Sequence, residues 1–326
     1  MENDLRNKTI LVTGSAGFIG FHTSQKLLEM GVKIVGLDSI NDYYDPKLKN
    51  HRNNILKKYN NYKFYQTDIS QEKELKKIFE ENKIDKICHL AAQAGVRYSL
   101  QNPGAYHQSN LQGFINIIEC ARNFDIKDFI YASSSSVYGK NKMRETGFSE
   151  EDSVDHPISL YAATKKANEL IAHNYHHLFG LNCTGLRFFT AYGPSSRPDM
   201  AMYLFTNEIV NNREVKLFNY GKMLRDFTYI DDIVDGIIKS LEKAYPYEIF
   251  NLGNSQTVEV KYLIELLEKA LNKKAKIKLE PIQPGDVEIT FANISKAEKM
   301  LNFKPQTNIE KGVENFIDWY KKYHQI

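Results

Sequence analysis

A glycine-rich turn between a strand and a helix limits this chain to a small set of folds. Residues 9–13 form a short apolar run that favours β-structure, and residues 21–30 have the pattern of a helix. Between them stand Gly14, Gly17 and Gly20. Gly14 permits a tight turn, Gly17 lets the backbone approach a ligand, and Gly20 allows the helix to pack closely on the strand. The pattern predicts the start of a βαβ unit.

An acid at the end of the next strand indicates which ligand this unit binds. Residues 32–38 form a second strand, and Asp38 ends it about 20 residues past the glycines, where a carboxylate can bond the adenine ribose of a dinucleotide. The pyrophosphate of such a ligand sits at the helix N-terminus. Asp38 would repel a 2′-phosphate, and Ser39 and Ile40 supply no arginine to hold one. We therefore expect NAD rather than NADP. A turn that only packs a helix on a strand is the competing interpretation.

The alternation of strands and helices continues through the first half of the chain. Strands are predicted at 62–67, 86–90 and 129–132, and helices at 72–81 and 110–121. This alternation implies an α/β fold with a doubly wound parallel sheet of the Rossmann type. Ligands of such sheets bind at the carboxyl ends of the strands. The residues that this topology brings to one edge are Gly14, Asp38, Asp68, Ala91 and Ser134.

The second half of the chain is expected to build a smaller lobe that interleaves with the first. We predict a dinucleotide-binding domain over 1–190 and a substrate-binding lobe over 191–326. A helix at 229–241 and a strand at 248–252 continue the earlier pattern. The segment 226–254 is therefore expected to return to the first domain.

Composition excludes several classes of partner. With 326 residues and 42% hydrophobic content, the chain can bury a large core in about two domains. A net charge of +3 gives no basic surface of the kind that binds nucleic acid. No apolar run approaches the roughly 18 residues of a membrane helix, and the polar first residues do not resemble a signal peptide. Three cysteines without metal-type spacing fit a reducing compartment. We expect a cytoplasmic protein.

Two further features receive no chemical role. His173, His176 and His177 share one face of a predicted helix, and we interpret them as partly exposed side chains rather than metal ligands. No bound metal is expected. The segment 41–62 is rich in Asn and Lys and is expected to form an inserted surface helix or loop without chemistry.

The strongest catalytic signal is the pair Tyr161 and Lys165. Four positions apart on a helix, the two side chains lie on one face. The preceding apolar strand ends in the hydroxyl run 133–136, which can direct Ser134 at the tyrosine. The Tyr/Lys spacing recurs elsewhere, but only Tyr161 opens a helix after such a strand. These groups can exchange a proton with a substrate hydroxyl while a neighbouring cofactor exchanges hydride. An exposed helix pair is the competing interpretation.

Several ordered motifs resemble the extended short-chain dehydrogenase/reductase family, in its nucleotide-sugar epimerase and dehydratase branch. The resemblance covers nearly the whole chain. Besides the glycine turn, the serine run and the Tyr161/Lys165 pair, it rests on His89-Leu90-Ala91-Ala92, Leu186-Arg187-Phe188-Phe189, Tyr192-Gly193-Pro194, Arg225-Asp226-Phe227 and Gly285-Asp286-Val287.

The resemblance implies a reaction at C4 of a sugar. Tyr161 takes the proton of the 4-hydroxyl while C4 gives hydride to a retained NAD, and hydride later returns to the other face of the rotated 4-keto sugar. Lys165 is implied to bond the nicotinamide ribose and to lower the pKa of the phenol, which is near 10 in free tyrosine. Ser134 is implied to share the hydrogen bond to the substrate oxygen.

The same resemblance extends to the two binding regions. The residues expected to contact NAD are Gly14, Gly17, Phe18, Ile19, Gly20, Asp38, Asp68, Ile69, Leu90, Ala91, Ala92, Tyr161, Lys165 and Phe188. The residues expected to contact the UDP-sugar are Arg97, Ser135, Ser136, Thr190, Arg197, Phe218, Arg225 and Asp286. Arg225 is implied to bond the diphosphate, and Asp286 the uridine ribose.

The two residues after Ser134 separate the branches of the family. Related 4,6-dehydratases carry Asp-Glu there, and related uronate decarboxylases carry Glu at the second place; this chain has Ser135 and Ser136. We therefore expect an epimerase. The segments 190–194, 197–201 and 221–232 are most similar to those of UDP-glucuronate 4-epimerases. Neutral donors from the two serines and Thr190, with the charge of Arg197, can hold a sugar carboxylate and keep it from leaving as carbon dioxide.

Alternatives stay open at this stage. A 4-epimerase of a neutral UDP-hexose or UDP-N-acetylhexosamine would leave Arg197 to bind the diphosphate or a surface acid. A non-catalytic NAD-binding sensor is a more remote alternative.

By resemblance, the helices at 106–122 and 161–179 are expected to form the seam of a homodimer.

Overall fold

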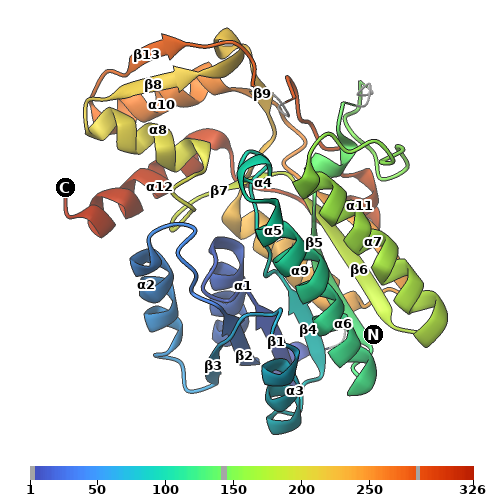
Figure 1. Ribbon diagram of the computed structural model, residues 1–326. Helices are drawn as coiled ribbons and strands as arrows, with labels where there is room; N and C mark the ends of the chain where they lie inside the picture. Colours follow the sequence, from blue (N-terminus) through green and yellow to red (C-terminus); the bar gives the residue numbers. More distant parts are fainter. Residues whose placement is uncertain (1–3, 141–144, 284–286) are drawn as a thin grey trace.

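The computed structural model describes residues 4–140, 145–283 and 287–326. At its centre lies a seven-stranded parallel sheet in the order β11-β6-β5-β4-β1-β2-β3 (Figure 1). The predicted α/β fold with a doubly wound parallel sheet is thereby confirmed. The strands are β1 Thr9–Thr13, β2 Lys33–Asp38, β3 Tyr62–Gln66, β4 Lys86–His89, β5 Asp128–Ser134, β6 Asn182–Phe188 and β11 Tyr247–Leu252.

Helices cover both faces of this sheet and enclose two separate cores. In β1, Ile10 and Val12 join one core and Leu11 joins the other, because successive side chains point to opposite faces. The first core includes the helices α1 Phe18–Glu29, α2 Pro46–Leu56 and α9 Ile230–Lys243, and helices from later in the chain extend it. Those that contribute to the second are α3 Glu72–Glu81, α6 Gly113–Asn123 and α7 Leu160–Phe179.

A smaller lobe lies beyond the carboxyl ends of the strands (Figure 1). It contains α8 Ala201–Val210, β8 Glu214–Leu217, α10 Val260–Leu271, β13 Lys276–Leu279 and α12 Ile309–His324, with β8 and β13 paired in parallel. Two short sheets join the lobes: β7 Thr190–Tyr192 with β10 Phe227–Tyr229, and β9 Leu224–Arg225 with β12 Val258–Glu259. The shorter helices are α4 Tyr98–Gln101, α5 Pro103–Tyr106 and α11 Ser295–Leu301, with 3₁₀ turns at Leu5–Asn7, Ser135–Tyr138 and Phe218–Gly221.

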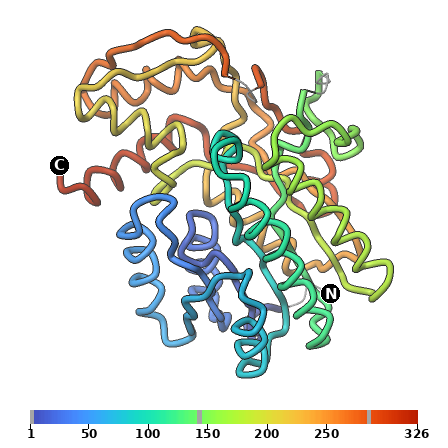
Figure 2. Tube along the Cα trace, viewed as in Figure 1, coloured from blue at the N-terminus to red at the C-terminus, as the bar shows by residue number. Residues whose placement is uncertain are grey.

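The chain passes between the lobes more than once. After β7 it enters the smaller lobe, and α9 and β11 then bring it back to the central sheet before α10 leaves again (Figure 2). The C-terminal α12 reaches α2, where the rings of His51 and Tyr323 lie 5.1 Å apart. The division into domains at residue 190 stays a prediction.

One predicted helix is irregular at its start. The sequence predicts a regular helix from Asn110, whereas the structure has a π-helical turn, His107–Gln112, ahead of α6. The Asn110 side chain accepts from the Gln93 amide and donates to Thr164, and its carbonyl accepts from Asn168. These tertiary bonds accompany the wider turn, and a sequence pattern does not reveal them.

A buried ion pair holds α7 against the sheet. Arg187 of β6 donates from Nε and Nη2 to the carboxylate of Glu169 on α7, at 2.8 and 2.9 Å, and both side chains are almost fully buried. Ser133, at the end of β5, donates to the same carboxylate at 2.7 Å. The hydroxyl of Tyr138 accepts from Arg187 and donates to Asn251. Three strands and one helix are thus tied together where β5 ends.

None of the described helices has the length and apolar character needed to cross a membrane.

Glu169→Gln tests this anchor. Removing one partner leaves the Arg187 charge buried without compensation, so we expect the free energy of unfolding to fall by about 3–5 kcal/mol. Urea denaturation followed by circular dichroism measures the change. The control is Glu74→Gln, which removes an exposed partner of Lys77 on α3 and should cost no more than about 0.5 kcal/mol. Equal losses in the two variants would contradict the role of the anchor.

Candidate functional site

A cavity of about 1110 Å³ opens where the carboxyl ends of the strands meet the smaller lobe. Its floor includes the turn after β1 and the segment after β4, which are the neighbouring strands at which the order of the sheet reverses. Doubly wound sheets bind ligands at such switch points. From the smaller lobe, α8 and β8 complete the wall. The cavity is therefore positioned to hold one ligand against the sheet and another against the lobe.

The glycine turn leaves room only for backbone. Gly14 has φ +71°, and a Cβ on it would lie 2.9 Å from the amide nitrogen of Ala91. A Cβ on Gly20 would lie 2.0 Å from the Gly14 carbonyl oxygen. Gly17 begins α1 without a side chain to cap the first-turn amides, and such amides bind phosphate groups. These residues fit the diphosphate of a dinucleotide.

The cavity next to this turn combines an acid with a cation. Asp38 is nearly buried and accepts from the Ala16 and Ile40 amides at 3.1 and 2.9 Å. Lys49 of α2 also lines the cavity and donates to the Asn41 carbonyl at 2.8 Å. Burial lowers the pKa of Lys49, and the charge of Asp38 opposes that shift. Asp38 therefore retains the place expected for a ribose-binding carboxylate, with a cation that the sequence did not suggest.

The segment 41–62 contributes to the site, contrary to the sequence-based expectation. Tyr43, Tyr44 and Lys49 all line the cavity. The available signal was position, because these residues directly follow the strand that ends at Asp38. Polar and aromatic residues just past the carboxyl end of a parallel strand are candidates for ligand contact.

Tyr161 and Lys165 lie in the first turns of α7, whose start is capped by Ser159. Lys165 donates to the Ala132 carbonyl at 2.9 Å, and burial lowers its pKa to about 8. Burial raises the pKa of the Tyr161 phenol, against the opposing effects of a hydrogen bond with Ser134 and the charge of Arg197. Desolvation outweighs these two effects, and the expected lowering of the phenol pKa by Lys165 stays a prediction. The predicted Tyr161–Ser134 contact is present.

The hydroxyl run turns sharply after β5. Ser134 accepts from the Ser136 amide at 3.2 Å and begins the 3₁₀ turn that carries Ser135 and Ser136. Both of these serines and Thr190 of β7 line the cavity. Neutral hydroxyl groups therefore surround the space next to Tyr161.

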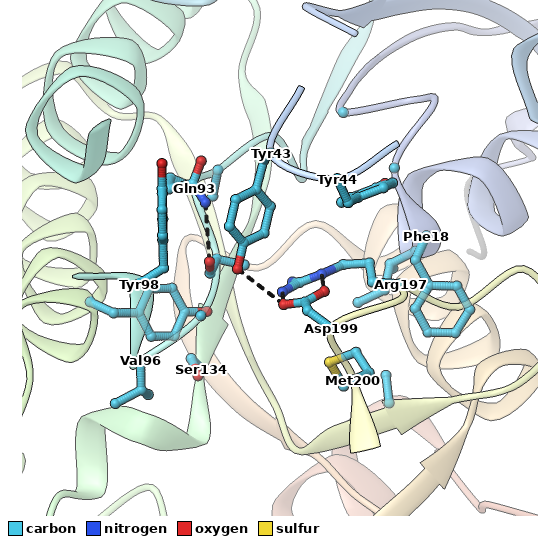
Figure 3. A pocket seen from close by; sticks show the side chains of 18 of the residues that line it. Phe18, Tyr43, Tyr44, Gln93, Val96, Tyr98, Ser134, Arg197, Asp199 and Met200 are labelled. Carbon is cyan, nitrogen blue, oxygen red and sulfur yellow. Dashed lines mark hydrogen bonds and ion pairs between the residues drawn. The ribbon is translucent and has the colours of Figure 1, made fainter. Parts of the chain in front are cut away.

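Arg197 is already paired with an acid. It donates from Nε and Nη2 to the Asp199 carboxylate, at 3.0 and 2.5 Å, and Tyr43 donates to the same carboxylate at 3.1 Å (Figure 3). Burial acts to raise the pKa of Asp199, but the charge and hydrogen bonds of Arg197 outweigh it and lower the pKa. Burial and Asp199 together raise the pKa of Tyr43 to about 12. Neither Asp199 nor Tyr43 was identified from the sequence.

Of the residues predicted to contact the nucleotide, some line the cavity and others do not. Arg97 and Phe218 line the cavity from opposite lobes, and the guanidinium lies 4.7 Å from the centre of the ring. Arg225 is not among the described residues that line the cavity; it donates to the carbonyls of Leu224 and Glu288 at 2.9 and 3.0 Å. Asp286 lies outside the described residues. The roles of these residues in binding stay predictions.

The remaining predicted residues also surround this cavity. Those expected to contact NAD, and found in its lining, are Gly14, Gly17, Phe18, Ile19, Gly20, Asp38, Asp68, Ile69, Leu90, Ala91, Ala92, Tyr161, Lys165 and Phe188.

Comparison with known proteins places the chain in a family. The profile described as GDP-mannose 4,6 dehydratase matches residues 11–316. A UDP-glucuronate 4-epimerase of Thermodesulfobacterium geofontis is 46% identical, with 96% of each chain covered. The crystal structure of a Bacillus cereus UDP-glucuronic acid 4-epimerase with UDP-glucuronic acid and NAD has a TM-score of 0.91 at 34% identity, covering 97% of this chain and 99% of that one. A Thermotoga maritima UDP-glucose 4-epimerase with UDP-glucose has a TM-score of 0.88 at 29% identity, covering 97% and 99%. The chain therefore belongs to the family of NAD-dependent nucleotide-sugar epimerases and dehydratases.

Proposed function

We propose that this protein is an NAD-dependent 4-epimerase that interconverts UDP-glucuronate and UDP-galacturonate. The observation that carries the proposal is the hydrogen bond between Tyr161 and Ser134, beside two further serines that line the cavity. Ser135 and Ser136 stand where an eliminating or decarboxylating relative would carry an acid. Proton exchange at Tyr161 is thus supported, whereas elimination of water is not.

The chain's own residues handle the proton and the orientation of the sugar. Gly14, Gly17, Gly20 and Asp38 would hold NAD, which when bound would supply a reversible hydride acceptor for C4 of the sugar. Tyr161 removes the proton of the 4-hydroxyl, holds it on its phenol oxygen and gives it back when the hydride returns. The Lys165 ammonium favours the phenolate during the first of these steps. Ser134 donates to the oxygen that remains at C4.

A neutral UDP-hexose or UDP-N-acetylhexosamine is the second candidate substrate. The observation in its favour is the pairing of Arg197 with Asp199, since the guanidinium already has a carboxylate partner. A UDP-glucose epimerase among the structural neighbours is consistent with such a substrate. The sensor alternative has less support, because Ser134, Tyr161 and Lys165 all line the cavity.

Proton NMR of UDP-glucuronate with the purified protein, without added NAD, tests the proposal. We expect UDP-galacturonate to form, because the cofactor is regenerated in each turnover. Tyr161→Phe removes the proton acceptor and should abolish turnover while leaving UDP binding intact. A pentose product, or conversion of neutral UDP-sugars alone, would overturn the uronate assignment, and substantial activity of the variant would overturn the role of Tyr161.

Arg197→Ala separates a carboxylate role from other roles of this residue. If the guanidinium holds the sugar carboxylate, the variant should raise KM for UDP-glucuronate by about tenfold, the effect of roughly one hydrogen bond to a charged group, or release pentose product. Both are followed by NMR and initial rates. Unchanged KM without pentose would assign Arg197 to the cavity wall only.

We further propose a homodimer that works in the cytoplasm. Large apolar side chains are exposed along α6 and α7, with Leu170 and Leu178 each 59% exposed. The three cysteines are buried and unpaired, which suits a reducing compartment.

Light scattering tests the oligomeric state. The proposal predicts twice the mass of one chain, and predicts that Leu170→Glu with Leu178→Glu yields the single-chain mass, because two charges would be buried in the seam. The matched control is Leu279→Glu on β13, an exposed leucine of the other lobe. A monomeric parent protein would refute the dimer.

A further inference from the structure

The Asp199 carboxylate, in the wall of the cavity, accepts several side-chain hydrogen bonds. It accepts two hydrogen bonds from Arg197 and one from Tyr43 (Figure 3). Asp199 and Arg197 stand on the loop between β7 and α8, whereas Tyr43 comes from the loop after β2. The carboxylate is thus held from both lobes. Its orientation is set before any substrate arrives.

The pairing uses only one edge of the guanidinium. An arginine has five N–H donors in a planar fork. Asp199 takes one from Nε and one from Nη2, and the Tyr43 hydroxyl is close enough to accept a third. The remaining donors can serve another acceptor. Arg197 can therefore contact a substrate oxygen without releasing Asp199.

The pairing also removes most of the attraction that Arg197 alone would exert on an anion. The low pKa of Asp199 keeps its carboxylate ionised at neutral pH. The pair then carries no net charge. A sugar carboxylate next to Nη1 gains a charge-assisted hydrogen bond but also meets the negative charge of Asp199 behind the fork. Arg197 therefore binds the sugar carboxylate less tightly than an unpaired arginine would.

Weaker binding of the sugar carboxylate matters for an epimerase because the bound sugar must move during the reaction. Between the two hydride transfers the 4-keto sugar must turn over in the cavity, and a carboxylate at C5 moves with the ring. A bidentate pair with an uncompensated arginine would have to break before that movement. Binding that is equally strong before and after the reacting step does not accelerate it.

We propose that Asp199, held by Tyr43, is a positioning residue that restricts Arg197 to a partial hold on the sugar carboxylate and so allows the 4-keto uronate to rotate. This inference rests on the proposed function. It goes beyond it by assigning a rate-determining role to an acid whose side-chain partners are Arg197 and Tyr43.

Asp199→Asn tests the inference on the full-length protein with its retained cofactor. The amide keeps the shape and one acceptor oxygen but removes the charge. We expect both KM and kcat for UDP-glucuronate to fall by about three- to tenfold, the effect of roughly one hydrogen bond to a charged group. Because rotation would become slower than the first hydride transfer, reduced nicotinamide should accumulate in the steady state. Its near-ultraviolet absorbance is measured by stopped flow.

The controls separate this role from loss of structure. Asp235→Asn removes an acid from the surface pair with Lys239 and should leave all three readouts unchanged. Tyr43→Phe removes one of the three bonds to Asp199 and should shift the readouts in the same direction by a smaller factor, so it also serves if Asp199→Asn does not fold. A raised KM with unchanged kcat, or no accumulation of reduced nicotinamide, would overturn the inference. If the parent protein does not convert UDP-glucuronate, the proposed function itself fails; if it does and Asp199→Asn behaves like the parent, only this inference fails.

Discussion

The buried pair of Glu169 and Arg187 is the interaction on which the catalytic geometry depends. Tyr161, Lys165 and Glu169 share one helix, while Ser133 and Ser134 share the end of one strand. Because Ser133 donates to the carboxylate that Arg187 also holds, the helix and the strand are joined one residue away from Ser134. A buried ion pair contributes little net stability compared with apolar side chains, but it tolerates very little displacement of either partner. The position of Tyr161 relative to Ser134 is thus fixed by a buried hydrogen-bond network that includes Glu169 and Arg187.

Desolvation dominates the electrostatics around Tyr161 and Lys165. It lowers the pKa of Lys165 and raises that of Tyr161, so both shifts disfavour the charged forms. The Ser134 hydrogen bond and the charge of Arg197 oppose the shift at Tyr161 without overcoming it. The phenol is consequently protonated at neutral pH in these surroundings.

Local patterns predicted the elements of the fold and many of the residues that line the cavity, whereas contacts between distant segments were missed. The glycine turn, the acid at the end of β2 and the Tyr161/Lys165 spacing each lie within one or two neighbouring elements, so a short stretch of sequence contains the whole signal. Asp199, the partner of Arg197, was only two residues away in the sequence. It was missed because the sequence does not distinguish an acid in the cavity wall from an acid in an exposed loop. Tyr43 is 156 positions from Asp199, and only the fold brings them together. The same reason explains the π-helical turn, which depends on contacts with Gln93 and α7.

The segment 41–62 gains its importance from Arg52, which links the two halves of the cavity. This side chain is fully buried and donates to the Ala16 carbonyl in the glycine turn at 2.9 Å and to the Ser195 carbonyl at 2.7 Å. No carboxylate pairs with it among the described residues, so backbone carbonyls and the Tyr44 hydroxyl meet its charge. A guanidinium suits this task because its fork can bond several fixed acceptors at once. The glycine turn and the loop that carries Arg197 and Asp199 are therefore joined through one side chain. The spacing of these two parts of the cavity wall thus depends on a residue in what the sequence presents as a surface insertion.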